Sequence, residues 1–68
     1  MNQYKVEFSY MLTPDTTRRV TEEDTSTACT TQDAVDQVRA WYGDLAGFRV
    51  EQVWIDRNNR WEVTEAWE

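Results

Sequence analysis

Histidine is absent from this 68-residue sequence, and cysteine and proline each occur once. With no histidine and only Cys29, the chain can form neither an internal disulfide nor a Cys/His zinc site. Cys29 also lacks a neighbouring base, and no glycine-rich phosphate loop is present, so nucleophilic catalysis and phosphoryl transfer lack their usual groups. We therefore expect a protein without a metal or another cofactor, in which Cys29 serves as a small apolar residue at the start of a helix.

Long hydrophobic runs are missing as well. No apolar stretch approaches the roughly 20 residues that a membrane helix needs, and the N-terminus has no basic segment followed by an apolar one. These absences predict a soluble, unexported protein without membrane contact. A single cysteine is compatible with the cytoplasm.

Basic residues are few: seven oppose thirteen acidic ones, which gives a formal charge of −6 and a pI near 4.4. Such a surface repels phosphate backbones, so we expect no direct binding to nucleic acid. Basic proteins, or proteins that handle nucleic acids, would be attracted. Solubility alone also explains a charge of this size, so the charge suggests a class of partner without naming one.

The first half of the chain predicts two strands. Residues 3–12 alternate between apolar and polar side chains, which is typical of a half-buried strand. Residues 13–16, Thr-Pro-Asp-Thr, are predicted to form a turn. A weaker strand is expected from Thr17 to about Thr25, because its threonines favour extended backbone. Its many charges suit the edge of a sheet.

A helix is predicted to follow. Thr30 or Thr31 can cap the first free N–H groups, and Asp33 and Asp36 suit the positive end of the helix dipole. Gly43 supplies the stop. Apolar residues recur at helical spacing and form one stripe that we expect to pack on the sheet, with Trp41 in the core: Ala34, Val35, Val38, Trp41 and Tyr42.

The C-terminal third reads as a hairpin. Two runs that favour strand, residues 48–57 and 60–68, flank Asn58-Asn59, and asparagine tolerates the positive φ that a primed turn needs. The resulting register pairs Arg57 with Arg60, Asp56 with Trp61, Ile55 with Glu62, Trp54 with Val63, Gln52 with Glu65 and Val50 with Trp67. One side of this ribbon would carry Phe48, Val50, Trp54, Trp61, Val63 and Trp67, and the other Val53, Ile55, Thr64 and Ala66.

The sum is a single α+β domain over residues 1–68 with the order ββαββ, in which one helix packs on one face of a four-stranded, mainly antiparallel sheet. One helix covers one face, so the other must be solvated, paired in an oligomer or occupied by a target. Trp54, Trp61 and Trp67 cannot all fit beneath the helix. At least one is therefore expected at a contact surface.

Acidic residues form the second candidate site. Asp33, Asp36 and Asp44 fall along one side of the helix region, and Glu22, Glu23 and Asp24 lie on the neighbouring edge strand, so together they predict an acidic strip for a basic partner. As catalytic pairs these carboxylates are poor, since a one-helix domain has little room for a cleft. Imitation of DNA phosphates is the weaker alternative, because Arg18, Arg19 and Arg39 interrupt the negative field. At the hairpin end, Arg57 and Arg60 are either solvated or grip a carboxylate of the target.

Residues 29–53 resemble the small host-RNA-polymerase inhibitors of podovirus-type coliphages. The shared elements are Thr31 and Asp33 at the start of the helix, Trp41 near its end, and Ala46-Gly47-Phe48 entering a strand that continues with Val50 and Val53. The resemblance implies a phage protein that docks on the jaw of the polymerase β′ subunit and blocks productive promoter complexes.

The chain also departs from that family. Two arginines on which the family relies are replaced here by Gln52 and Trp54, and of the acidic helix positions only Asp33 is kept. A further strand, residues 60–68, extends beyond the point where those inhibitors end. The resemblance therefore supports the fold and the general role of host inhibitor more strongly than it supports the target.

The leading hypothesis is a non-enzymatic inhibitor, located in the cytoplasm of an infected bacterial host, that occludes a nucleic-acid enzyme and most specifically RNA polymerase. An anti-defence protein, such as an anti-CRISPR or anti-restriction factor that imitates DNA, has the same size and acidity. A homodimeric structural or assembly protein would instead pair its tryptophan face with a second copy.

Overall fold

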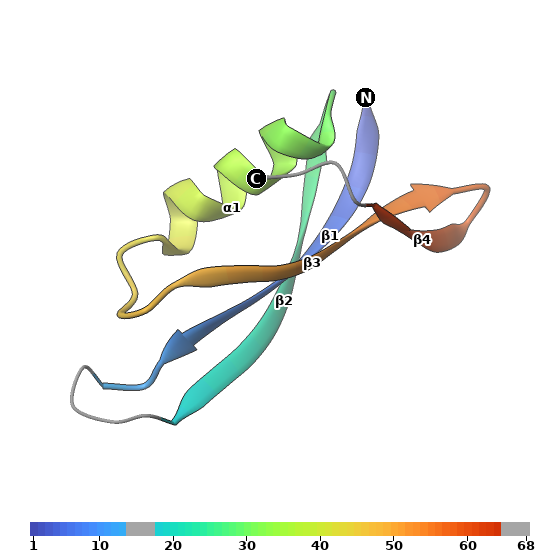
Figure 1. The fold of residues 1–68 in the computed structure, drawn as a ribbon. Helices are drawn as coiled ribbons and strands as arrows, with labels where there is room; N and C mark the ends of the chain where they lie inside the picture. The colour runs from blue at the N-terminus through green and yellow to red at the C-terminus, as the bar shows by residue number, and fades with distance from the viewer. Residues whose placement is uncertain (14–17, 65–68) are drawn as a thin grey trace.

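A computed structural model describes residues 1–13 and 18–64, and it confirms the ββαββ fold (Figure 1). The sheet contains four strands in the order β2-β1-β3-β4, and every neighbouring pair is antiparallel. A single helix packs on one of its faces. The elements are β1 (Asn2–Met11), β2 (Arg19–Ala28), α1 (Thr31–Tyr42), β3 (Arg49–Arg57) and β4 (Arg60–Thr64). No helix in these residues is long and apolar enough to cross a membrane.

The edge position predicted for the second strand is confirmed, but its bounds are not. β2 lies at one edge of the sheet and continues to Ala28, three residues past the predicted end at Thr25. Ser26 and Ala28 point to the helix side and are buried there, at 4% and 1% exposure. Gln37 of α1 holds this end of the strand, because its amide accepts a hydrogen bond from the Ser26 hydroxyl and donates one to the Thr27 carbonyl at 3.1 Å.

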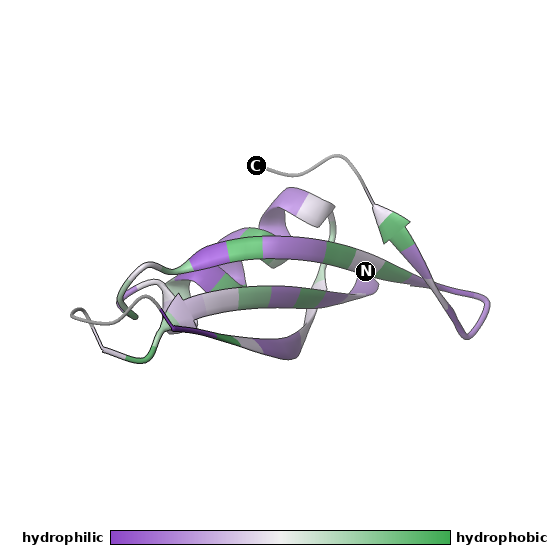
Figure 2. Ribbon diagram, turned by 60° about the horizontal axis from the view of Figure 1, so that its bottom comes forward, coloured by the Kyte–Doolittle hydropathy of each residue, from purple (hydrophilic) through white to green (hydrophobic). Residues whose placement is uncertain are grey.

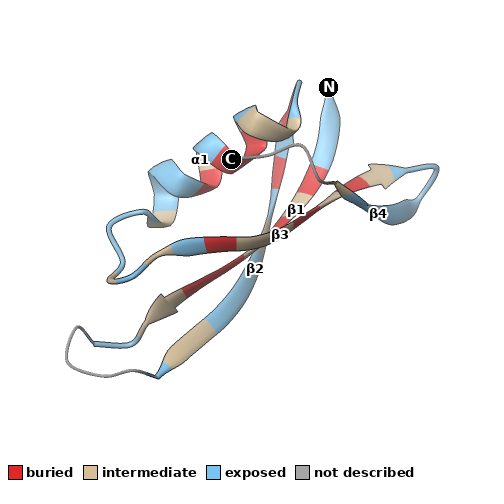
Figure 3. Ribbon diagram, in the orientation of Figure 1, coloured by how far each residue is buried: buried red, intermediate tan, exposed pale blue. Residues whose placement is uncertain are grey.

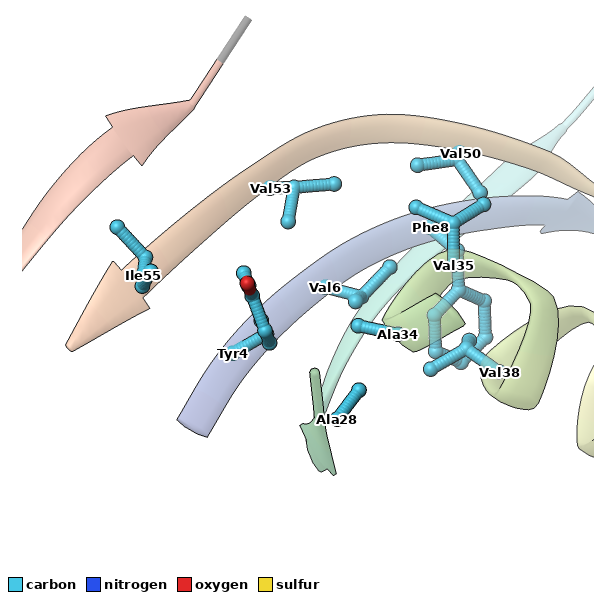
Figure 4. Packing of buried hydrophobic residues seen from close by; sticks show 10 residues of the cluster. All are labelled: Tyr4, Val6, Phe8, Ala28, Ala34, Val35, Val38, Val50, Val53 and Ile55. Carbon is cyan, nitrogen blue, oxygen red and sulfur yellow. The ribbon is translucent and has the colours of Figure 1, made fainter. Parts of the chain in front are cut away.

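The helix begins where the capping residues predict. The Thr30 hydroxyl accepts a hydrogen bond from the Asp33 N–H at 3.1 Å, and Gly43 follows the last residue of α1. Ala34, Val35 and Val38 are buried against the strands. The core cluster lies between α1 and the sheet (Figure 3 and Figure 4) and consists of Tyr4, Val6, Phe8, Ala28, Ala34, Val35, Val38, Val50, Val53 and Ile55.

Trp41 is not part of that core, so the prediction for it is wrong. Its side chain is 56% exposed. Tyr42, four residues after Val38, takes the place above the sheet and stacks on Phe8 with ring centroids 4.6 Å apart. Because each helical residue is rotated by about 100° from the last, Trp41 turns to the flank of the stripe.

The predicted hairpin and its register are confirmed from Arg57 and Arg60 to Trp54 and Val63. Asn58 and Asn59 have φ values of 54° and 64°, as a type I′ turn requires. The two predicted pairs that include residues 65 and 67 lie outside the described residues.

A β-bulge corrects the predicted faces of β3. Glu7 of β1 lies opposite Gln52, but the next residue, Phe8, lies opposite Val50, so Glu51 is an extra residue in the ladder. Side chains alternate along a strand, and one extra residue therefore moves Val50 to the other face. The alternation of hydropathy along β1 and β3 is visible in Figure 2.

As a result, Val50 lies on the helix side together with Val53 and Ile55, and all three are buried. Phe48 packs against the same core, with its ring 5.5 Å from that of Phe8. The prediction that Phe48 and Val50 share a face with Trp54 is therefore wrong. Trp54 and Trp61 lie on the face away from α1.

Candidate protein-binding surface

The sheet face opposite α1, here called the open face, is covered by no other element of the described chain (Figure 1 and Figure 3). Cross-strand neighbours share a face, which fixes the residues that belong to it. Lys5 lies opposite Trp54 and Thr25, and Trp54 lies opposite Val63. The open face carries Gln3, Lys5, Glu7, Ser9 and Met11 of β1, Arg19, Thr21, Glu23, Thr25 and Thr27 of β2, Arg49, Glu51, Gln52, Trp54 and Asp56 of β3, and Trp61 and Val63 of β4.

The hairpin end of this face forms a tryptophan patch that consists of Lys5, Trp54, Trp61 and Val63. The Lys5 ammonium lies 4.6 Å from the ring centroid of Trp54 and 5.2 Å from that of Trp61, within range of a cation–π interaction with both. Trp61 is 42% exposed and Val63 57% exposed. The exposed tryptophan that the sequence predicts is therefore found in Trp61, on a strand at the sheet edge.

At the other end of the open face, polar side chains form a hydrogen-bonded network. The Ser9 hydroxyl donates to a Glu51 carboxylate oxygen and accepts from Arg19 Nε at 3.1 Å. Arg49 Nε donates to the same Glu51 oxygen at 2.7 Å. The hydrogen bond from Ser9 has the largest effect on the pKa of Glu51, and the hydrogen bond from Arg49 adds to it. Together they hold this pKa below its ordinary value of 4.5. This network leaves Ser9 buried and gives the end a structural role.

On the helix side, two acidic residues of β2 pair with tyrosines. Tyr10 donates a hydrogen bond to Glu22, and Tyr42 donates one to Asp24. Each bond favours the protonated phenol, so the pKa values of Tyr10 and Tyr42 are raised above 10.0. Glu22 and Asp24 therefore help to fix aromatic rings that stack on Phe8.

The structure brings together Asp33 and Asp36 of the predicted acidic strip. Asp33 lies one turn before Gln37, on the β2 side of α1, where it borders an open depression of about 390 Å³ together with Asp36 and Cys29. Glu22 and Asp24 share this side of the sheet. Glu23 does not, because it lies opposite Glu7 on the open face.

Cys29 at this depression is exposed and does not serve as a packed apolar residue, contrary to the prediction. In the parts of the chain that the structure describes, no three cysteine or acidic side chains gather closely enough to hold a metal ion.

The two predicted arginines at the hairpin end lie opposite each other and are both exposed. They share a face with Ile55 and Glu62, and Arg57 Nε comes within 3.9 Å of Glu62 Oε1. Arg57 and Arg60 are therefore on the opposite side of the ribbon from Trp54 and Trp61. Trp67, also a predicted contact residue, lies outside the described residues.

Lys5 is the functional candidate that sequence reasoning missed. Its place in an alternating strand assigns it to the face opposite Tyr4 and Val6, and nothing local connects it to a tryptophan nearly fifty positions away. Only the pairing of β1 with β3 sets Lys5 against Trp54. A basic residue on the solvent face of a central strand is the one signal that the sequence offers.

Comparison of the chain with protein-family models, with curated proteins and with solved structures finds no match. The described side chains on the open face contribute two indole rings, the ammonium of Lys5, the guanidinium groups of two arginines, and carboxylates and other hydrogen-bonding groups. Aromatic rings beside charged and hydrogen-bonding groups are common in surfaces that recognise another macromolecule.

Proposed function

We propose that this protein is a non-catalytic inhibitor that binds a host nucleic-acid enzyme through the open face and acts by occupying its surface. Bacterial RNA polymerase is the first target to test. The alternating exposure of the sheet leaves a preformed surface, so binding needs no refolding of β1, β3 and β4.

One observation carries the proposal: an indole ring of the sheet is left in solvent on a face that no element of residues 1–13 and 18–64 covers. Trp61 is 42% exposed beside Val63, although the helix side of the same small sheet buries valines and a phenylalanine completely. Tryptophan is enriched among the residues that dominate binding energy at protein interfaces. Exposed aromatic surface also lowers solubility, and a binding function would explain why the chain keeps it.

The choice of target is supported by charge and by the resemblance of residues 29–53. The net charge of −6 favours encounter with the basic surfaces of nucleic-acid enzymes. One position at which the resembled inhibitors carry a key arginine holds Trp54, and Trp54 belongs to the tryptophan patch. This protein would then use the same strand for recognition as those inhibitors, with an indole in place of a guanidinium group.

The test is transcription in vitro by bacterial RNA polymerase with stoichiometric protein. We expect inhibition by the native chain, loss of at least about tenfold in potency for Trp61→Ala, and little change for Trp41→Ala. These variants are matched, since both remove an exposed tryptophan but on opposite sides of the molecule.

Inhibition that depends on Trp41 and is indifferent to Trp61 would contradict the open face as the interface. No inhibition at excess protein would contradict the polymerase as target and direct attention to bacterial defence complexes. Sedimentation velocity addresses the remaining alternative, because a dimer that Trp61→Ala dissociates would make the patch a self-association surface.

A further inference from the structure

We propose that the tryptophan patch binds a partner segment in which an acidic side chain stands next to an apolar one. The carboxylate would meet the ammonium of Lys5, and the apolar group would cover Trp61 and Val63. This inference rests on the proposed function for the open face as docking surface, but it does not use the identity of the target.

The first ground is that Lys5 forms no ion pair with any described residue. Its ammonium is held between two indoles, at 4.6 and 5.2 Å from the centroids. Among the described residues, the ion pairs involve Arg39, Arg49 and Arg57 and none involves Lys5. Glu7 and Asp56 share the open face but form no ion pair with it. Lys5, the cation of the patch, therefore has no carboxylate within ion-pair distance in the described part of the chain.

The second ground is that Lys5 already occupies one face of each indole ring. Both indoles direct electron-rich faces at Lys5. An incoming lysine or arginine would meet a like charge at the position where a cation binds best. An incoming carboxylate would form a charge-assisted hydrogen bond to the ammonium instead.

Coverage of the patch by a partner would make this pairing necessary. A partner that buried the patch without supplying an anion would remove water from the Lys5 ammonium, which is unfavourable when no counter-charge replaces it. Specificity for an acidic residue at this point follows, even though the protein as a whole is acidic.

The third ground is the size of the exposed apolar surface. Trp61 and Val63 are only about half exposed, at 42% and 57%. Their free area is far below the roughly 800 Å² that each partner buries in a stable interface. The patch fits the side chains of a short segment better than a self-complementary dimer interface.

A random peptide library selected on the immobilised full-length chain tests the proposal directly. We expect enriched peptides to carry aspartate or glutamate adjacent to a large apolar residue. Titration calorimetry with an enriched peptide should then show a Kd raised about tenfold or more by Trp61→Ala and by Lys5→Met. Lys5→Arg keeps the charge and should stay within about threefold of the native Kd. Circular dichroism of each variant establishes that it is folded.

Enrichment of basic peptides, enrichment without a shared pattern, or binding that Lys5→Met leaves unchanged would overturn the proposal. A dimer that depends on Trp61 would overturn it too, since a second copy would then be the occupant. Failure of the transcription test would leave these peptide results intact, so the two ideas are separable. A peptide that binds the native chain and also relieves its inhibition of RNA polymerase would show that the same patch serves both activities.

Discussion

Tyr42 at the last residue of α1 donates a hydrogen bond to Asp24 in the middle of the edge strand β2. The same ring stacks on Phe8 of the central strand, with centroids 4.6 Å apart. One side chain thus ties the end of the helix to two strands. It does so by a polar bond at the rim and by ring contact over the core.

Alkaline pH is expected to weaken this connection. Hydrogen bonds to Glu22 and Asp24 raise the pKa values of Tyr10 and Tyr42 in the folded chain above the unfolded value of 10.0. Their contribution to stability is therefore complete below pH 10.0 and is lost as the pH rises through the folded pKa values. Chemical unfolding across this range should show falling stability, with a shallower fall for the double variant Tyr10→Phe, Tyr42→Phe. An equal fall in both proteins would contradict the assignment.

Acid is expected to act on the opposite face of the sheet, at the hydrogen bonds of Glu51. Hydrogen bonds from Ser9 and Arg49 lower the pKa of Glu51 below 4.5, so its contribution is present above pH 4.5 and is lost as the pH falls through the folded value. Glu51→Gln should reduce stability by about 1 kcal/mol at neutral pH and flatten the acid limb of the stability profile. Urea unfolding at several pH values measures both effects. Glu23→Gln, at an exposed position of the edge strand β2, is the control.

The order of elements could be predicted from the sequence because the strongest signals are local. The Thr30 cap and the Asn58-Asn59 turn each act within a few residues, and the alternation in β1 needs only the strand itself. The bulge at Glu51 has no such signal. It arises where β3 meets β1, and one extra residue was enough to exchange the faces of Phe48 and Val50.

The candidate site was predicted in part for the same reason. The register of the hairpin placed Trp54 and Trp61 on the same face, and this register depends only on the local turn. Lys5 was missed, because its contact with these rings depends on a long-range strand pair. Trp41 was misplaced, since helical periodicity gives a stripe but does not say which of two adjacent aromatic residues packs on Phe8.

The hairpin turn offers a test of local strain. Asn59 has φ of 64°, which glycine adopts at less cost and alanine at more. Asn59→Gly should raise the free energy of unfolding by about 0.5 kcal/mol, and Asn59→Ala should lower it by about 1 kcal/mol. Urea unfolding followed by tryptophan fluorescence measures both. The same sign for the two variants would mean that the turn is not type I′.

Phe8 and Trp41 give the sharpest contrast between core and surface. Phe8 is 1% exposed and touches the rings of Tyr10, Tyr42 and Phe48, so Phe8→Ala should cost about 3–5 kcal/mol. A domain of this size has little more stability than that, so the variant should be largely unfolded at 25 °C. Trp41 is 56% exposed, and Trp41→Ala should change stability by less than about 1 kcal/mol. Circular dichroism and urea unfolding of the two variants decide the matter, and a Trp41→Ala chain as unstable as Phe8→Ala would return Trp41 to the core.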